Sequence, residues 1–131
     1  MTINTTYVRQ GHGTVRPYLS GSVDLPEFVR QVFDAVELER FEFGPDEFHV
    51  EMQIGDSTIV IEAGELPPEI KPWTCSVYVY VADVDAVHAR ALSLGATLLA
   101  AVEDKPYQER QGGFIDAAGN IWWVSTYNSA T

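Results

Sequence analysis

The sequence predicts an α+β fold made of two βαβββ units, whose curved mixed sheets surround a cleft. An alternating apolar run from Thr74 to Val81 leads directly into a capped amphipathic helix and three further strand-like segments. The same layout occurs earlier in the chain, and the two helix starts, Asp24 and Asp83, lie 59 residues apart (83 − 24). Because the layout recurs at a fixed offset, the chain is interpreted as a duplicated unit.

The first unit is expected over residues 15–63. A strand over 15–23 leads to Asp24, which is expected to cap the following helix, with Glu27 at the capping-box position. Apolar side chains then recur at helical spacing, namely Leu25, Phe28, Val29, Val32 and Phe33. Three strands should follow, at residues 36–43, 47–54 and 57–62. A hairpin turn at Gly55-Asp56 should join the last two of them.

The second unit is expected over residues 74–127, after a linker over 64–73 that holds three prolines and Trp73. Its first strand places Ser76, Tyr78 and Tyr80 on one face. Asp83 should cap the next helix, which ends at Gly95. The apolar stripe of that helix consists of Val84, Val87, His88, Ala91 and Leu92. Strands should follow at 97–103, 111–116 and 120–127, flanked by an arm at 1–14 and a tail at 128–131.

The composition narrows the function classes. The formal net charge is −11, which argues against nucleic-acid binding and is compatible with a cationic ligand. No apolar run approaches the roughly 18 residues of a membrane span, and the first residues lack a signal-peptide core. A cytoplasmic location is therefore expected, and the single Cys75 forms no internal disulfide.

Five segments together are similar to the vicinal oxygen chelate superfamily, in its glyoxalase/bleomycin-resistance, PhnB-like branch. The resemblance covers about 15–127 and implies a homodimer with paired or exchanged βαβββ units. It also implies a fold that hosts many reactions, so the site residues must decide the chemistry. The segments are PYLSGSVD (17–24), HVEMQIGDS (49–57), VYVYVADVDAVHARALSLGA (77–96), PYQER (106–110) and DAAGNIWWVST (116–126).

The resemblance also implies where metal ligands would lie. The corresponding positions hold Pro17, Ser76, Glu62 and Trp123, of which only Glu62 binds a metal well. Because a catalytic divalent site needs about three protein ligands, no metal or other cofactor is expected. One alternative rebuilds a metal site from His49, Glu51 and Glu62, as in a glyoxalase-type lyase or isomerase. Another is metal-free acid–base chemistry by His49 poised by Glu51.

The aromatic residues favour ligand binding. Flat aromatic walls suit a planar, aromatic or cationic small molecule, as in the drug-sequestering members of the superfamily. Trp122 should alternate into the core. A third hypothesis is a non-catalytic interaction module whose cleft is filled by its own side chains. The predicted ligand-binding residues are Leu19, His49, Glu51, Tyr78, Tyr80, Tyr107, Arg110 and Trp123.

Overall fold

The computed structural model describes residues 4–65 and 74–128. Most of the predicted linker over 64–73, including Trp73, therefore lies outside the described residues, as do residues 129–131 of the predicted tail. Neither helix of the described part, at nine and ten residues, is long and apolar enough to cross a membrane.

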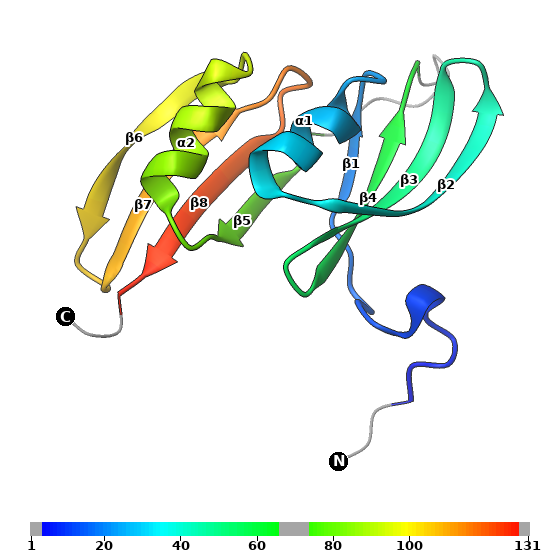
Figure 1. The fold of residues 1–131 in the computed structure, drawn as a ribbon, viewed down its shortest axis with the longest axis horizontal. Coiled ribbons are helices and arrows are strands. Elements are labelled where there is room, and N and C mark those ends of the chain that lie inside the picture. Colours follow the sequence, from blue (N-terminus) through cyan, green and yellow to red (C-terminus); the bar gives the residue numbers. More distant parts are fainter. Residues whose placement is uncertain (1–3, 66–73, 129–131) are drawn as a thin grey trace.

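The predicted duplication is confirmed, because each half has the order βαβββ (Figure 1). The first sheet has the strand order β1-β4-β3-β2 and the second the order β5-β8-β7-β6. In each sheet the first and last strands of the unit pair in parallel, and the other pairs are antiparallel. The first unit comprises β1 (Tyr18–Gly21), α1 (Leu25–Phe33), β2 (Val36–Gly44), β3 (Glu47–Ile54) and β4 (Ser57–Ala63). The second comprises β5 (Ser76–Tyr80), α2 (Val84–Ser93), β6 (Thr97–Lys105), β7 (Glu109–Ile115) and β8 (Ile121–Tyr127).

The two helices begin differently. Asp83 caps α2 as predicted, since its Oδ1 accepts a hydrogen bond from the Ala86 amide at 3.1 Å. The prediction that Asp24 caps α1 was wrong, because the backbone of Asp24 is already helical. Its amide instead donates to the hydroxyl of Ser22 at 3.3 Å, and Ser22 thus provides the oxygen at this helix start. Glu27 binds Arg30 rather than closing a capping box.

Helix α1 packs on the first sheet through the apolar stripe that the sequence predicted. Leu25, Val29 and Val32 of α1 are buried in the same cluster as Val50 and Ile61 of the sheet. Burial of these side chains supplies the main favourable term for this half. The helix therefore covers one face of the first sheet.

Leu19 belongs to this buried cluster and has no exposed surface. The prediction that Leu19 is a ligand-binding residue was wrong, because its side chain lies on the buried face of the sheet, toward the helix. The 59-residue offset aligns the helices, but the buried residue of the second half is Val79, 60 residues after Leu19 (79 − 19). A one-residue difference in a strand turns a side chain to the other face, so Tyr18 rather than Leu19 lies on the face away from α1.

Helix α1 also contacts the second half and thereby joins the two units. Its Phe33 ring lies 5.0 Å from that of Trp122 in β8, and its Phe28 ring meets Phe114 of β7 edge-on at 6.1 Å. Trp122 and Phe114 are fully buried, as predicted for Trp122. From α2, Arg90 donates to the Val32 carbonyl at 3.0 Å near the end of α1. Each half thus completes its core with side chains of the other.

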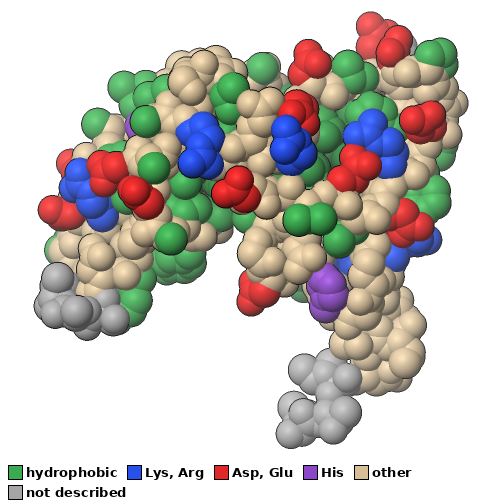
Figure 2. All heavy atoms as spheres, in the orientation of Figure 1, with side chains coloured by type: hydrophobic (Ala, Val, Ile, Leu, Met, Phe, Trp, Pro, Cys, Tyr) green, Lys and Arg blue, Asp and Glu red, His purple; other side chains and the backbone are tan. Residues whose placement is uncertain are grey.

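Basic side chains lie beside acidic ones on the surface shown in Figure 2. Arg30 pairs with Glu27 within α1, and Arg40 pairs with Glu37 in β2. Such exposed pairs contribute little to stability. They nevertheless neutralise carboxylates locally in a strongly acidic chain.

Replacing Phe114 by Ala should lower the free energy of unfolding by about 3–5 kcal/mol, because the ring fills the contact between the halves. Replacing Phe43, which is 70% exposed, should change it by about 0.5 kcal/mol or less. Urea unfolding of both variants measures the difference. Equal effects would contradict a shared aromatic core.

Candidate functional site

Each sheet has one face that its helix does not cover, and these are called here the first and second open faces. The first open face carries Tyr18, His49, Glu51 and Glu62, together with Glu39 and Phe41 of β2. The second carries Tyr78, Tyr80, Glu109, Trp123 and Ser125, together with Gln111 and Tyr127. Polar and aromatic side chains on an accessible sheet face are the chemistry from which a site can be built.

On the first open face, His49 binds the carboxylate of Glu62 on the neighbouring strand. The Nδ1 atom of His49 lies 2.5 Å from Glu62 Oε1, whereas its Nε2 atom lies 3.7 Å from Glu51 Oε1. Burial, followed by the interaction with Glu62, raises the pKa of Tyr18 to about 12. From the sequence we expected Glu51 to poise His49, but in the structure the carboxylate bonded to His49 is that of Glu62.

Glu51 is instead held by the N-terminal arm and is only 4% exposed. It accepts a hydrogen bond from Gln10 at 2.9 Å and pairs with Arg16 at 3.4 Å. Arg16 also donates to the carbonyl groups of Arg9 and His12, which folds the arm upon itself. The segment from Arg9 to Arg16, which includes the end of the predicted arm, therefore lies against the first open face and takes Glu51 out of reach of a ligand.

This arrangement does not suit a catalytic metal ion. Among residues 4–65 and 74–128, no group of three or more His, Cys, Asp or Glu side chains is placed to hold one. Of the three alternative ligands, Glu51 already has guanidinium and amide partners. His49 and Glu62 are left, and two donors fall short of the roughly three that a catalytic divalent site needs.

The second open face contains a carboxylate held by hydroxyl groups. Glu109 of β7 accepts hydrogen bonds from the hydroxyls of Tyr78, of Tyr80 at 2.8 Å and of Ser125 at 2.7 Å. The bond from Tyr78, with those from Ser125 and Tyr80, holds the pKa of Glu109 below its ordinary value. Burial, followed by the bond to Glu109, raises the pKa of Tyr78 to about 12. At neutral pH the cluster thus combines neutral phenols with one ionised carboxylate.

The strand order explains why these residues meet. Strand β8 lies between β5 and β7, so Tyr78 and Tyr80 must reach across β8 to bind Glu109. The residue they cross is Ser125, which is small and adds its own hydroxyl. Trp123 likewise covers a glycine, because a Cβ atom on Gly113 would lie 2.8 Å from its ring. Small residues on one strand therefore leave room for the rings of its neighbours.

The tyrosine rings are accessible. Tyr78 is 44% exposed and Tyr80 62% exposed, and their ring centroids lie 5.4 Å apart in an edge-on arrangement. Beside them, Tyr80, Glu109 and Tyr127 line a shallow pocket of about 400 Å³. Two predicted site residues, Tyr78 and Tyr80, thus lie together beside Trp123, whereas Glu109 and Tyr127 were missed.

Two other predicted ligand-binding residues lie elsewhere. Arg110 follows Glu109 and therefore points to the helix-bearing side of the second sheet, where it pairs with Asp85 of α2 at 2.8 Å and with Asp104 at 3.2 Å. Its predicted place at the cleft was wrong for this reason. Tyr107, in the turn before β7, donates to Gln111 at 2.9 Å and is 53% exposed at the border of the second open face.

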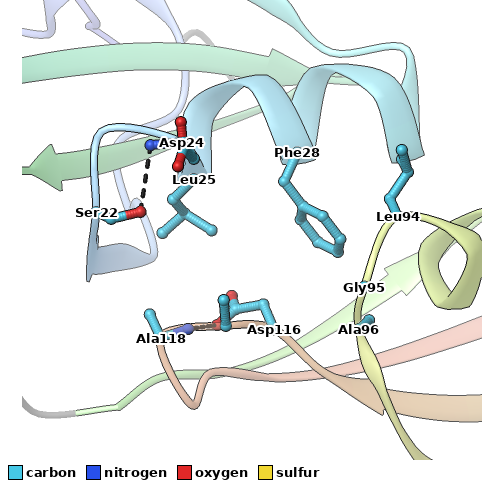
Figure 3. Close-up of a pocket in the computed structure, with 10 residues that line it drawn as sticks. Ser22, Asp24, Leu25, Phe28, Leu94, Gly95, Ala96, Asp116 and Ala118 are labelled. Atoms are coloured by element: carbon cyan, nitrogen blue, oxygen red, sulfur yellow. Dashed lines mark hydrogen bonds between the residues drawn. The ribbon is translucent and has the colours of Figure 1, made fainter.

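A separate pocket of about 280 Å³ lies at the junction of the two halves (Figure 3). Leu25 and Phe28 of α1 form one wall, and the turn around Asp116 and Ala118 forms the other. Asp116 is only 4% exposed, and its carboxylate accepts bonds from Trp122 and from the amides and side chain of this turn. Because the carboxylate oxygens of Asp116 are engaged by these donors, the walls that this pocket presents to a ligand are mainly apolar.

The carboxyl group of Glu109 should titrate below the ordinary value of 4.5, and its pKa should rise toward 4.5 in Tyr78→Phe. Because the pKa is lower in the folded chain, the stability that the cluster adds is present above pH 4.5 and lost as the pH falls through the folded pKa. Carboxyl ¹³C NMR titrations of the wild type, Tyr78→Phe and the control Tyr7→Phe measure this. An unshifted Glu109 in the wild type would be inconsistent with the cluster.

The chain has relatives of known sequence and of known structure. No family model matches it. Mb0911c, an uncharacterized protein of Mycobacterium bovis, is 32% identical over 107 residues, which cover 73% of this chain and 70% of that protein. Counterparts from Mycobacterium tuberculosis match at the same identity over 62% of their length.

The solved structures with the same fold include TioX from Micromonospora sp. ML1, with a TM-score of 0.68 and 20% identity, covering 86% of this chain and 98% of that one. A glyoxalase/bleomycin resistance protein/dioxygenase family enzyme from Burkholderia phytofirmans has a TM-score of 0.65 and 21% identity, covering 86% and 94%. The chain therefore belongs to the family of the mycobacterial protein Mb0911c, and it shares its duplicated βαβββ fold with TioX and the Burkholderia protein.

Proposed function

We propose that this protein is a metal-independent small-molecule-binding protein of the glyoxalase/bleomycin-resistance type, which holds an aromatic, antibiotic- or toxin-like ligand on its second open face. The observation that carries the proposal is the pair of accessible rings of Tyr78 and Tyr80, both fixed by hydrogen bonds to Glu109. Rings fixed in this way lose little conformational entropy when a flat ligand stacks on them.

The neighbouring residues support this assignment. Trp123 extends the aromatic surface along β8, and Tyr127 borders the adjacent pocket. The hydroxyl of Tyr107 and the amide of Gln111 add polar groups at the border. A mainly aromatic wall with a few fixed polar groups is the usual composition of a small-molecule site.

A second copy of the chain would complete the site in this proposal. Both open faces lie on the sides of the sheets away from the helices, and the second leaves Tyr78 and Tyr80 accessible in a single chain. A homodimer that brings an open face of one copy against that of its partner would enclose the ligand and bury exposed rings. The predicted cytoplasmic location is consistent with this role and stays a prediction.

The Burkholderia protein is described as a glyoxalase/bleomycin resistance protein/dioxygenase family enzyme, a description that names both enzymes and drug-resistance proteins. At 21% identity, this likeness concerns the fold. The ligand assignment therefore depends on the residues of the second open face themselves.

Replacing Tyr78 or Tyr80 by Ala should weaken binding of flat aromatic drugs about tenfold, since each loses a stacking surface. Quenching of tryptophan fluorescence across a drug panel measures affinity, and Trp123→Phe identifies the reporting ring. Tyr7→Ala, which removes a 74% exposed ring from the arm, is the matched control. Absence of any response across the panel would rule out the proposed role.

The same variants test the hypothesis of a non-catalytic interaction module. If side chains of the protein fill the cleft, Tyr80→Ala should lower the free energy of unfolding by about 3–5 kcal/mol. Because the Tyr80 ring is 62% exposed, we expect Tyr80→Ala to lower the free energy of unfolding by much less than this.

The bond between His49 and Glu62 favours one other function, a lyase or isomerase of the glyoxalase type with a non-standard site. Protein purified without chelators should contain little zinc, nickel, manganese or iron by elemental analysis, because Glu51 is engaged by Arg16. Near-stoichiometric metal that Glu62→Gln removes would instead support the enzyme, and Glu42→Gln is the control.

A further inference from the structure

We propose that the pocket beside Tyr80 selects an organic cation, so that the ligand of the second open face carries an ammonium or a cationic ring nitrogen placed against Glu109. This inference rests on the proposed function and names the chemical class of its ligand. Its basis is the pocket lined by Tyr80, Glu109 and Tyr127.

The carboxylate of Glu109 retains capacity for a ligand. A carboxylate has about four lone-pair directions, and three hydroxyl donors occupy part of them. These donors are neutral, so they orient the carboxylate without removing its negative charge. The lowered pKa of Glu109 keeps that charge at neutral pH.

Among residues 4–65 and 74–128, the charge of Glu109 also lacks a basic partner, in contrast to several other carboxylates there. Glu51 pairs with Arg16, Asp85 with Arg110 and Glu62 with His49. In the described part of the chain, no ion pair with Glu109 is found. A carboxylate that is fixed, ionised and uncompensated is complementary to a cation.

The rings around the carboxylate strengthen this preference. Tyr80 and Tyr127 are 62% and 55% exposed on either side of a pocket of about 400 Å³. The face of an aromatic ring attracts a cation, and the attraction grows where water is displaced. Since the pKa of Tyr80 is raised by its bond to Glu109, its phenol stays neutral and keeps this bond. Rings and one carboxylate together favour a positively charged, weakly hydrated group over a neutral one.

A guanidinium from a second copy of this chain has the same charge and is the main competing occupant. In that case Glu109 would serve the contact between copies, and a free cation would gain no advantage in the assembled protein. The test below separates the two, because a small cation leaves the oligomeric state unchanged whereas loss of an intersubunit ion pair weakens assembly.

Two probes of nearly the same shape test the inference on the full chain. N-methylquinolinium carries a permanent charge, whereas quinoline is uncharged at neutral pH. Isothermal titration calorimetry at low ionic strength should show the cation binding about tenfold more tightly than quinoline. Added salt should reduce the difference, because it screens the charge of Glu109.

The variant Glu109→Gln should reduce the preference to about twofold or less, because it removes the charge and nearly preserves the shape. Glu42→Gln removes one exposed carboxylate from β2 and is the matched control, with the preference retained. Circular dichroism checks the fold of each variant. If Glu109→Gln does not fold, Tyr127→Leu tests the same pocket and should also lower the preference.

The outcomes separate this inference from the proposed function. Equal binding of both probes, or a preference that survives Glu109→Gln, would overturn the cation site and leave aromatic binding intact. Binding of neither probe would overturn both. Dissociation of Glu109→Gln into monomers in sedimentation, with no cation preference in the wild type, would assign the carboxylate to a second copy and also overturn the inference.

Discussion

The arrangement depends on one helix that is apolar on two sides. Helix α1 covers the first sheet with Val29 and Val32 and presents Phe28 and Phe33 to the second half. Because α1 packs on the first sheet and α2 on the second, with α1 joining the two halves, neither helix covers the opposite face of its sheet. The hydrophobic contact that joins the repeats thereby also creates the two surfaces on which a function can be built.

The two open faces have diverged in their chemistry. On the first, Gln10 and Arg16 hold Glu51, and His49 shares a hydrogen bond with Glu62, so both carboxylates have partners within the chain. On the second, Glu109 has hydroxyl partners and no cation in the described residues. A duplicated fold can therefore engage its carboxylates with arginine and histidine in one repeat and with neutral hydroxyls in the other.

Much of the fold follows from local patterns. The alternation in β5 and the helical spacing in α2 predicted both elements and the cap at Asp83. The wrong predictions concern residues whose position depends on strand register or on contacts between distant parts of the sequence. The predicted face of Leu19 was wrong because the repeat alignment is shifted by one residue in this strand. The predicted face of Arg110 was wrong because side chains alternate along β7.

The partners of the site were beyond such patterns. Glu109 meets Tyr78 and Tyr80 across an intervening strand, at a separation of 31 and 29 residues, and no local signal reports that contact. This contact could have been predicted from the strand order of a βαβββ unit. Ser125 lies between the two tyrosine rings and the carboxylate and is small enough to let them meet. The partners of Glu51, Gln10 and Arg16, are likewise far from it in sequence, and no local pattern connects them.

The most direct test of the binding site is a set of intermolecular nuclear Overhauser effects between bound N-methylquinolinium and the protein. The account predicts contacts from the ligand to ring protons of Tyr78, Tyr80 and Tyr127 on the second open face. Contacts confined to residues around His49, or to Leu25 and Phe28 at the junction of the halves, would contradict it.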